Sequence, residues 1–277
     1  MKKLILTLAS IALAAGLGMA QDLATATETF NNAAASIQAG DKAGALGYFK
    51  SALTMAEALG GDGAEIVANC KKYIPDLMLS MAKDAIKAGE YTSAVSQLKE
   101  VAEVAAKYED AGAVEDATKL IPIVYIQQGS QALKAKDVQG AADAFKEALA
   151  IDPTNANAAL RLGSALSSLG DTDGAIAAFE TAAANGQQTA AYKQISTILL
   201  KSASSALKAK DYKAAIESAN KSLGYNESAN AYKIAGTAYN ALGNKADAIK
   251  SLGKYLELSP NAADAAQIKT AIENLKK

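Results

Sequence analysis

Along this chain, small and apolar residues recur at fixed distances from a series of short polar turns. The hexapeptide ALKAKD stands at residues 132–137 and again at 206–211. Looser copies of it occur at 36–41, 85–90, 166–171 and 239–244. Each copy ends in Asp, Glu or Asn, usually after Gly or Lys, and this chemistry suits a tight turn between two helices. The pattern therefore predicts six helical hairpins.

The residues that flank the turns match as well. Four residues beyond the last residue of each turn there is an alanine: Ala45, Ala94, Ala141, Ala175, Ala215 and Ala248. Eight residues before it there is a small residue: Ala33, Ala82, Gly129, Gly163, Ala203 and Gly236. Eight residues after it, the side chain is usually larger: Phe49, Leu98, Phe145, Phe179, Ala219 and Leu252. Small residues on both sides of a turn let two antiparallel helices approach closely, and the larger residue fills the space beyond.

Two connections in the first half of the sequence are longer than the others. The helical pattern after Phe49 runs to GGDG at 60–63 and resumes, and the pattern after Leu98 runs to a loop at 109–113. We expect Pro75 and Pro122 to stand at the starts of the helices that follow, where a missing N–H costs little.

The end of the sequence holds one more amphipathic helix. Ala265, Ile268, Ile272 and Leu275 fall on one stripe of it, and polar residues cover the other face. A repeat stack needs such a cap, because its last hairpin would otherwise expose an apolar face.

Composition argues against catalysis. The chain has no histidine, so the commonest general base and the commonest metal ligand are both absent. No phosphate-binding loop or EF-hand sequence occurs, and Asp and Glu mostly stand four residues from Lys, as surface pairs do. The net charge is −1, and aromatic residues are not interleaved with a basic patch, which argues against nucleic acid. We expect no catalytic residue, no metal site and no cofactor.

A single cysteine, Cys70, excludes an internal disulfide. We expect it to be a small, half-buried helix residue, and the alternative is a bridge between two molecules.

The N-terminus has the pattern of a secretory signal. Lys2 and Lys3 precede an apolar run that ends near Leu17, and small residues stand at 18 and 20. We expect cleavage before Gln21, export to the periplasm, and no membrane insertion after cleavage. Secretion, or retention by an uncleaved N-terminal anchor, is the alternative.

The hairpins resemble the tetratricopeptide repeat (TPR), a unit of about 34 residues. Residues 125–153 carry its signature at Tyr125, Gly129, Ala141, Phe145, Ala148 and Pro153. Similar matches occur in 156–189 and 229–262. The resemblance implies an all-α, right-handed superhelical solenoid of about six hairpins with a C-terminal capping helix. One solenoid would cover 21–277, with units near 26–74, 75–121, 122–155, 156–195, 196–228 and 229–262 and a cap at 263–277.

In this family the first helices line a concave groove that holds a protein or peptide. Carried over by position, the candidate groove residues are Lys83, Gln127, Ser130, Asn157, Arg161, Ser164, Lys201, Asn230, Lys233, Thr237 and Asn240. Their basic members outnumber the one acid expected on the same face, Asp76. A basic groove favours, as partner, an acidic segment or the C-terminus of another protein. The alternative is that these lysines are scattered and solvated.

The resemblance thus implies a non-catalytic scaffold or adaptor for protein–protein interaction in the cell envelope. Two other classes stay open at this point: a structural solenoid that self-associates, and a solute-binding protein or enzyme, which would need a convergent polar pocket.

Overall fold

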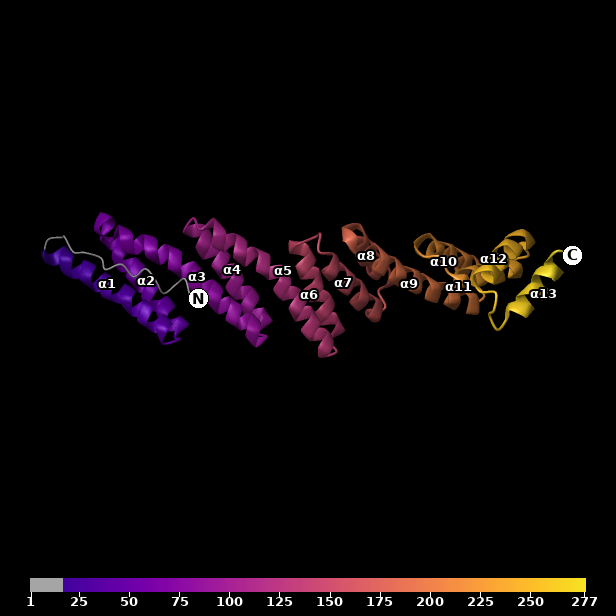
Figure 1. Cartoon of the computed structure of the whole chain (residues 1–277), viewed down its shortest axis with the longest axis horizontal. Coiled ribbons are helices and arrows are strands. Elements are labelled where there is room, and N and C mark those ends of the chain that lie inside the picture. The colour runs from indigo at the N-terminus through magenta and orange to yellow at the C-terminus, as the bar shows by residue number, and fades with distance from the viewer. Residues whose placement is uncertain (1–16) are drawn as a thin grey trace. The chain divides into compact units, whose positions relative to one another are not determined.

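The computed structural model describes residues 17–277 (Figure 1). Residues 1–16, which hold most of the expected signal segment, lie outside the described residues. Throughout 17–277 the protein forms helices joined by short connections, without a strand, so the expected all-α class is confirmed. None of the helices in this range is long and apolar enough to cross a membrane.

The chain divides into two compact units, with the boundary between Ser130 and Gln131. In unit 1, helices α1 and α2 pack as a hairpin, α3 and α4 form the next hairpin, and α2 packs against α3. The bounds in unit 1 are α1 Leu17–Gln38, α2 Lys42–Ala58, a 3-10 turn Gly60–Gly63, α3 Ala64–Ala88, α4 Tyr91–Lys107 and α5 Ala111–Lys134, which runs across the boundary.

In unit 2, the pairs α7/α8, α9/α10 and α11/α12 are hairpins, and each helix also packs against the next one in sequence. The bounds in unit 2 are α6 Val138–Ile151, α7 Ala156–Leu169, α8 Thr172–Ala182, a kinked turn Ala183–Gln187, α9 Gln188–Lys208, α10 Tyr212–Tyr225, α11 Ala229–Ala241, α12 Lys245–Leu258 and α13 Ala265–Leu275.

All six predicted turns have one construction. The residue before the final Asp, Glu or Asn is in the left-handed region in every turn: Gly40, Gly89, Lys136, Gly170, Lys210 and Gly243. The following residue is the N-cap of the next helix: Asp41, Glu90, Asp137, Asp171, Asp211 and Asn244. In five of the six, the cap side chain accepts the backbone N–H three residues ahead, which satisfies a donor that the helix leaves unpaired.

The connection between α4 and α5 uses the same construction, although its sequence lacks the hexapeptide. Glu109 has φ 60°, and the Asp110 carboxylate accepts the backbone N–H of Ala113 at 3.0 Å.

The residues predicted to pack beside the turns are buried in both units. The six alanines four residues beyond the turns are fully buried, and so are the three alanines among the small residues eight before them. A Cβ placed on Gly163 would lie 2.7 Å from the ring of Phe179, and one on Gly236 would lie 2.7 Å from Leu252. Close helix approach over small residues is therefore confirmed.

The α9/α10 hairpin packs differently at the point where its helices cross, because Ala219 stands where other hairpins carry a larger side chain. Ala219 packs there with Ala203 and Ala235, and Ile234 and Tyr239 pack against the three alanines. The same hairpin also holds two buried hydroxyls, since Ser196 Oγ and Ser222 Oγ lie 2.8 Å apart. The Ser222 hydroxyl also lies 3.2 Å from the carbonyl oxygen of Ser196. Each buried hydroxyl therefore has a hydrogen-bond partner, as burial of a polar group requires.

The placement expected for the two prolines is wrong. Pro75 lies inside α3 and Pro122 inside α5, each about one-half of the way along a helix that starts earlier. A proline in a helix interior leaves the carbonyl four residues earlier without its helical donor. Both prolines are buried, so apolar packing offsets this loss. The extra length of the first half therefore lies in α3 and α5, which start at Ala64 and Ala111.

The C-terminal helix has the predicted amphipathic character. Ala265 and Ile272 are buried, Ile268 and Leu275 are half-buried, and α13 packs against α12. The apolar stripe thus faces the last hairpin, as a cap requires.

Candidate functional site

Four of the candidate groove residues line one cavity in unit 2. Lys201 on α9 meets Asn230, Lys233 and Thr237 on α11 around a volume of about 370 Å³. The remaining lining residues are Leu200, Ser204, Leu207 and Ile234. Two first helices therefore build the site together, and they also pack against each other.

Helical spacing explains why these side chains share a face. On α9 the lining residues stand at positions 200, 201, 204 and 207, and on α11 at 230, 233, 234 and 237. Residues three, four and seven apart lie on one side of an α-helix.

The cavity combines apolar walls with a few polar groups. Leu200, Leu207 and Ile234 supply the apolar surface, and the two ammonium groups supply positive charge. Lys201 is exposed, and within residues 17–277 its ammonium has no ion-pair partner. This is the composition expected of a site that holds a peptide segment by its side chains and a carboxylate by its charge.

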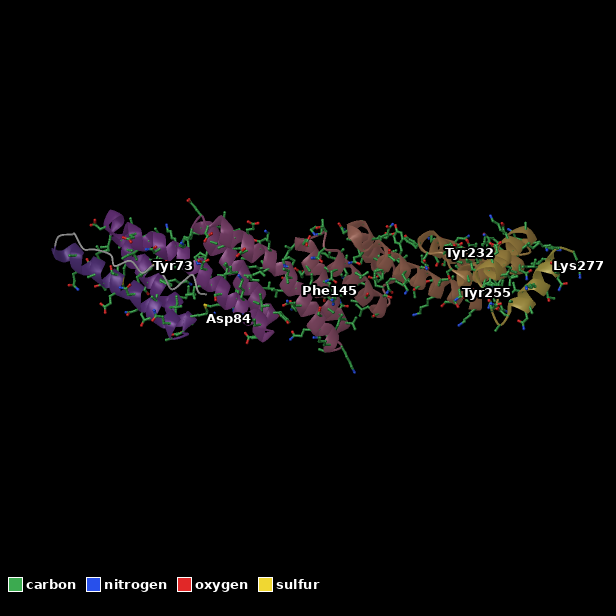
Figure 2. The ribbon with its side chains drawn as sticks, viewed as in Figure 1. Tyr73, Asp84, Phe145, Tyr232, Tyr255 and Lys277 are labelled. Atoms are coloured by element: carbon green, nitrogen blue, oxygen red, sulfur yellow. The ribbon has the colours of Figure 1, made fainter. Side chains whose placement is uncertain are left out.

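Lys233, by contrast, already has a carboxylate partner within the same protein. Its Nζ lies 2.5 Å from Oδ2 of Asp264, the residue before α13. The Tyr255 hydroxyl donates to the other oxygen of the same carboxylate, and Lys233 Nζ lies 5.5 Å from the centre of the Tyr255 ring. Tyr255 is labelled in Figure 2, near the C-terminal end of the protein.

These contacts shift the pKa values of all three groups. Hydrogen bonds from Lys233 and Tyr255 lower the pKa of the Asp264 carboxyl. The bond to Asp264 raises the pKa of Lys233 and also that of Tyr255. All three pKa shifts are those expected when Lys233 and Asp264 are both charged and the neutral Tyr255 phenol donates a hydrogen bond to the carboxylate.

The other candidate residues do not line this cavity. Asn157, Arg161 and Ser164 lie on α7, where Arg161 Nε donates to Asn157 Oδ1 at 2.9 Å and the Ser164 hydroxyl donates to a backbone carbonyl. Asn240 is exposed further along α11. Lys83 is exposed on α3, Gln127 is exposed on α5, and the Ser130 hydroxyl donates to the carbonyl of Ile126.

Unit 1 carries more acid near its first helices than the sequence indicated. Burial raises the pKa of Asp76, and the nearby carboxylates of Asp110 and Asp116 raise it further. Asp76 is therefore not an isolated acid on an otherwise basic face. Lys72 and Lys83 lower the pKa of Asp76, so acids and lysines lie together in this part of unit 1. The cavity in unit 2, by contrast, is lined by two lysines and by no acid.

Two other cavities lie in unit 1. One, of about 420 Å³, lies beside Lys42 and Asp84, which form a salt bridge with each other. The second, of about 660 Å³, lies where the end of α4 meets the start of α5. In the first cavity, Asp84 neutralises the charge of Lys42. The second cavity is lined by two glutamates and one lysine.

The described residues contain no cluster of metal-ligating side chains, and their one cysteine is buried. No group of three or more Cys, Asp or Glu side chains there could hold a metal ion. Cys70 is fully buried rather than half-buried, and burial raises the pKa of its thiol to about 12. A buried, protonated thiol is a poor nucleophile and cannot bridge two molecules without local unfolding.

Sequence reasoning missed the apolar walls of the cavity and the carboxylate beside it. Leu200, Leu207 and Ile234 could have been found, because they stand three or four residues from the candidates on the same helices. Asp264 carried no such signal, because its contact with Lys233 depends on how α13 returns to the last hairpin.

The fold defines a helical-repeat protein, and one of its cavities lies between two first helices, α9 and α11. Comparison with family models gives the same class: models described as tetratricopeptide repeat match residues 132–198 and 200–263. Residues 132–263 are thus tetratricopeptide repeats, and proteins built from such repeats serve as scaffolds for protein–protein interaction. A search of curated proteins found no match.

Several solved structures are similar to parts of this protein. A crystal structure of MamA covers 57% of this chain and 84% of its own at 22% identity, with a TM-score of 0.39. The structure of YrrB, described as a TPR protein with an unusual peptide-binding site, covers 70% and 91% at 19% identity, with a TM-score of 0.37. PilW, described as a type IV pilus biogenesis factor, covers 73% and 90% at 16% identity, with a TM-score of 0.32.

Proposed function

We propose that this protein is a non-catalytic scaffold of the cell envelope that binds an extended segment of a partner protein in the α9–α11 cavity. The partner segment presents a carboxylate, from an acidic side chain or from its own C-terminus. The observation that carries this proposal is the convergence of Lys201, Asn230, Lys233 and Thr237 on one cavity with apolar walls.

The charges and donors of the cavity support a carboxylate as the ligand group. An ammonium donates to carboxylate oxygens in charge-assisted hydrogen bonds, which are about twice as strong as neutral ones. Asn230 and Ser204 bring an amide and a hydroxyl that would bind the backbone of an extended peptide. The Thr237 hydroxyl donates to the Lys233 carbonyl, so it would serve the peptide as an acceptor. Leu200, Leu207 and Ile234 would cover an apolar side chain beside the carboxylate.

The cell-envelope location rests on the N-terminal sequence. Lys2 and Lys3, the apolar run and the small residues before Gln21 form the expected order of a secretory signal. Mass spectrometry of the intact protein from the exported fraction tests this part of the proposal. A mass that begins at Gln21 supports it, and a full-length protein confined to the cytoplasm contradicts it.

Reversing the charge of Lys201 tests the cavity. We expect Lys201→Glu to remove the partner that the wild-type protein captures from the exported fraction, because a carboxylate would face a carboxylate. The matched control is Lys213→Glu on α10, an exposed lysine of the same hairpin that lies outside the cavity. Capture compared by quantitative mass spectrometry, with thermal unfolding of both variants, reports the result.

Equal capture by Lys201→Glu and wild type would contradict binding in this cavity. Loss of capture by both variants would show that net charge, rather than the site, decides the interaction. Raised salt should weaken wild-type capture, since the ammonium groups lie within reach of solvent ions.

A further inference from the structure

Asp264 behaves unlike the other aspartates that precede helices in this protein. Asp41, Asp137, Asp171 and Asp211 each use the carboxylate to cap the helix that follows. Asp264 stands before α13 in the same way, yet its side chain makes no capping bond. Its carboxylate binds Lys233, a residue that lines the cavity, and Tyr255 instead of its own helix end.

This arrangement sets how much charge the cavity presents. The lining residues include two ammonium groups, those of Lys201 and Lys233, and no acid. Asp264 pairs with Lys233 at 2.5 Å, which leaves one unpaired positive charge at the cavity. Both members of the pair are partly exposed, at 41% and 25% of their side-chain surface, so an incoming ligand could reach Lys233 if Asp264 were absent.

We propose that Asp264 is a specificity-determining residue: by pairing with Lys233 it limits the cavity to ligands with a single carboxylate and disfavours segments with several acids. The inference rests on the proposed function, because it assigns the charge of the ligand that the same cavity takes. A second carboxylate on a ligand would meet a lysine that is already neutralised, and it would lie close to the negative charge of Asp264.

The contact also links ligand choice to the C-terminal helix. Asp264 immediately precedes α13, whose packing against α12 is confined to one apolar stripe. The bonds from Lys233 and Tyr255 therefore fix the start of α13 in place, and the same contact neutralises one of the two lysines that line the cavity. A ligand that replaced Asp264 as the partner of Lys233 would release this contact at the N-cap of α13.

The test uses three peptide probes and the ¹⁵N-labelled full-length mature protein. The probes are Ser-Gly-Leu-Ala-Ser-Leu with a blocked N-terminus and a free C-terminal carboxylate, the same peptide amidated, and a form with two added aspartates before the free C-terminus. Titration is followed by shifts of backbone amide signals, which detect weak binding. The measured quantity is the ratio of dissociation constants for the aspartate-bearing and monoacidic probes.

We expect wild type to bind the monoacidic probe more tightly than the amidated one and to gain nothing from the two added aspartates. Asp264→Asn should improve binding of the aspartate-bearing probe by about two- to fivefold relative to the monoacidic one, since one exposed ion pair contributes on this scale. Asp264→Glu should restore the wild-type ratio because it keeps the charge.

Glu273→Gln is the matched control. It removes one negative charge from the same helix at an exposed position paired with Lys276, and it should leave the ratio unchanged. Amide signals of α13 show whether each variant keeps the cap helix docked. An unchanged ratio in Asp264→Asn, or an equal change in Glu273→Gln, would overturn the role of Asp264 alone. Failure of every probe to shift signals of α9 and α11 in wild type would overturn the proposed function and the inference with it.

Discussion

At the scale of single residues, the fold is organised by the size of a few side chains. Gly163 faces the ring of Phe179 so closely that an added Cβ would lie 2.7 Å from it. Gly253 lies inside α12 with nothing within 4 Å of the same added atom. The two glycines therefore serve different purposes, although both stand in helices.

Replacing each of these glycines by alanine should give opposite results. We expect Gly163→Ala to lower the free energy of unfolding by about 1–3 kcal/mol, because the helices must separate or the ring must move. Gly253→Ala should raise it by about 0.5–1 kcal/mol, since alanine loses less backbone entropy in a helix. Urea unfolding followed by circular dichroism measures both. Equal stability of the two variants would contradict the close approach of α7 and α8.

How far residues could be predicted depended on whether their contacts were local. The burial of the alanines beside each turn was predictable from their spacing. A residue at a fixed distance from the turn always lies where the two helices of the hairpin come closest. The prolines did not follow, because the rule for Pro75 and Pro122 describes an isolated helix, while here buried packing offsets the lost hydrogen bond. The Asp264–Lys233 contact joins residues of different helices, and no periodicity encodes it.

At the scale of elements, each hairpin depends on one left-handed residue before its second helix. Glycine takes this conformation readily, and four of the six turns use it. Lys136 and Lys210 adopt φ 64° and 63° with a full side chain, so both duplicated ALKAKD turns carry backbone strain. The repeated hexapeptide is thus the less stable version of the common turn.

Relieving this strain should stabilise the protein. We expect Lys136→Gly to raise the free energy of unfolding by about 1 kcal/mol, since a side chain in the left-handed region costs about that much. Lys134→Gly, two residues earlier in the last turn of α5, should lower it by a similar amount because glycine weakens a helix. Thermal and urea unfolding of the two variants should therefore move apart, and a shift in the same direction would contradict the strain.

The cap helix should loosen in acid. The folded pKa of Asp264 is lowered, mainly by its bond to Lys233, so its contribution to stability is present above the unfolded pKa of about 3.9 and is lost as pH falls through the folded pKa. We expect the protection factors of the α13 amides, corrected for the intrinsic exchange rate at each pH, to fall in this range before those of α11 and α12. In Asp264→Asn, α13 should exchange faster at neutral pH and show less dependence on acid. An α13 that stays protected at pH 2 would contradict this role of the carboxylate.

At the scale of the whole molecule, stability should be local to each unit. Helices in a repeat protein contact mainly their neighbours in sequence, so stability is approximately a sum of nearest-neighbour terms. The protein divides into two compact units at Ser130, each with its own sequence of packed helices. The all-α fold class was predictable from the sequence because every unit repeats the same local pattern.

A core truncation in one unit should therefore leave the other protected. Leu98 in α4 is fully buried, and Leu98→Ala should cost about 2–5 kcal/mol through the lost contacts and the cavity left behind. We expect faster hydrogen exchange in α3 and α4, with little change in α10 to α12. Phe179→Ala in unit 2 should give the converse result. Uniform loss of protection in both units after either change would show one cooperative structure instead.

The shared construction of the turns bears on how such a protein can change its length. Asp137 and Asp171 each follow a left-handed residue and each cap a helix with the same bond to a glycine three residues ahead. Excising the segment from one to the other would join two ends with the same turn geometry, and duplicating it would add one pair of packed helices equivalent to α6 and α7. Genetic recombination at these turns would therefore yield shorter or longer proteins in which the junction keeps the turn geometry that is already present.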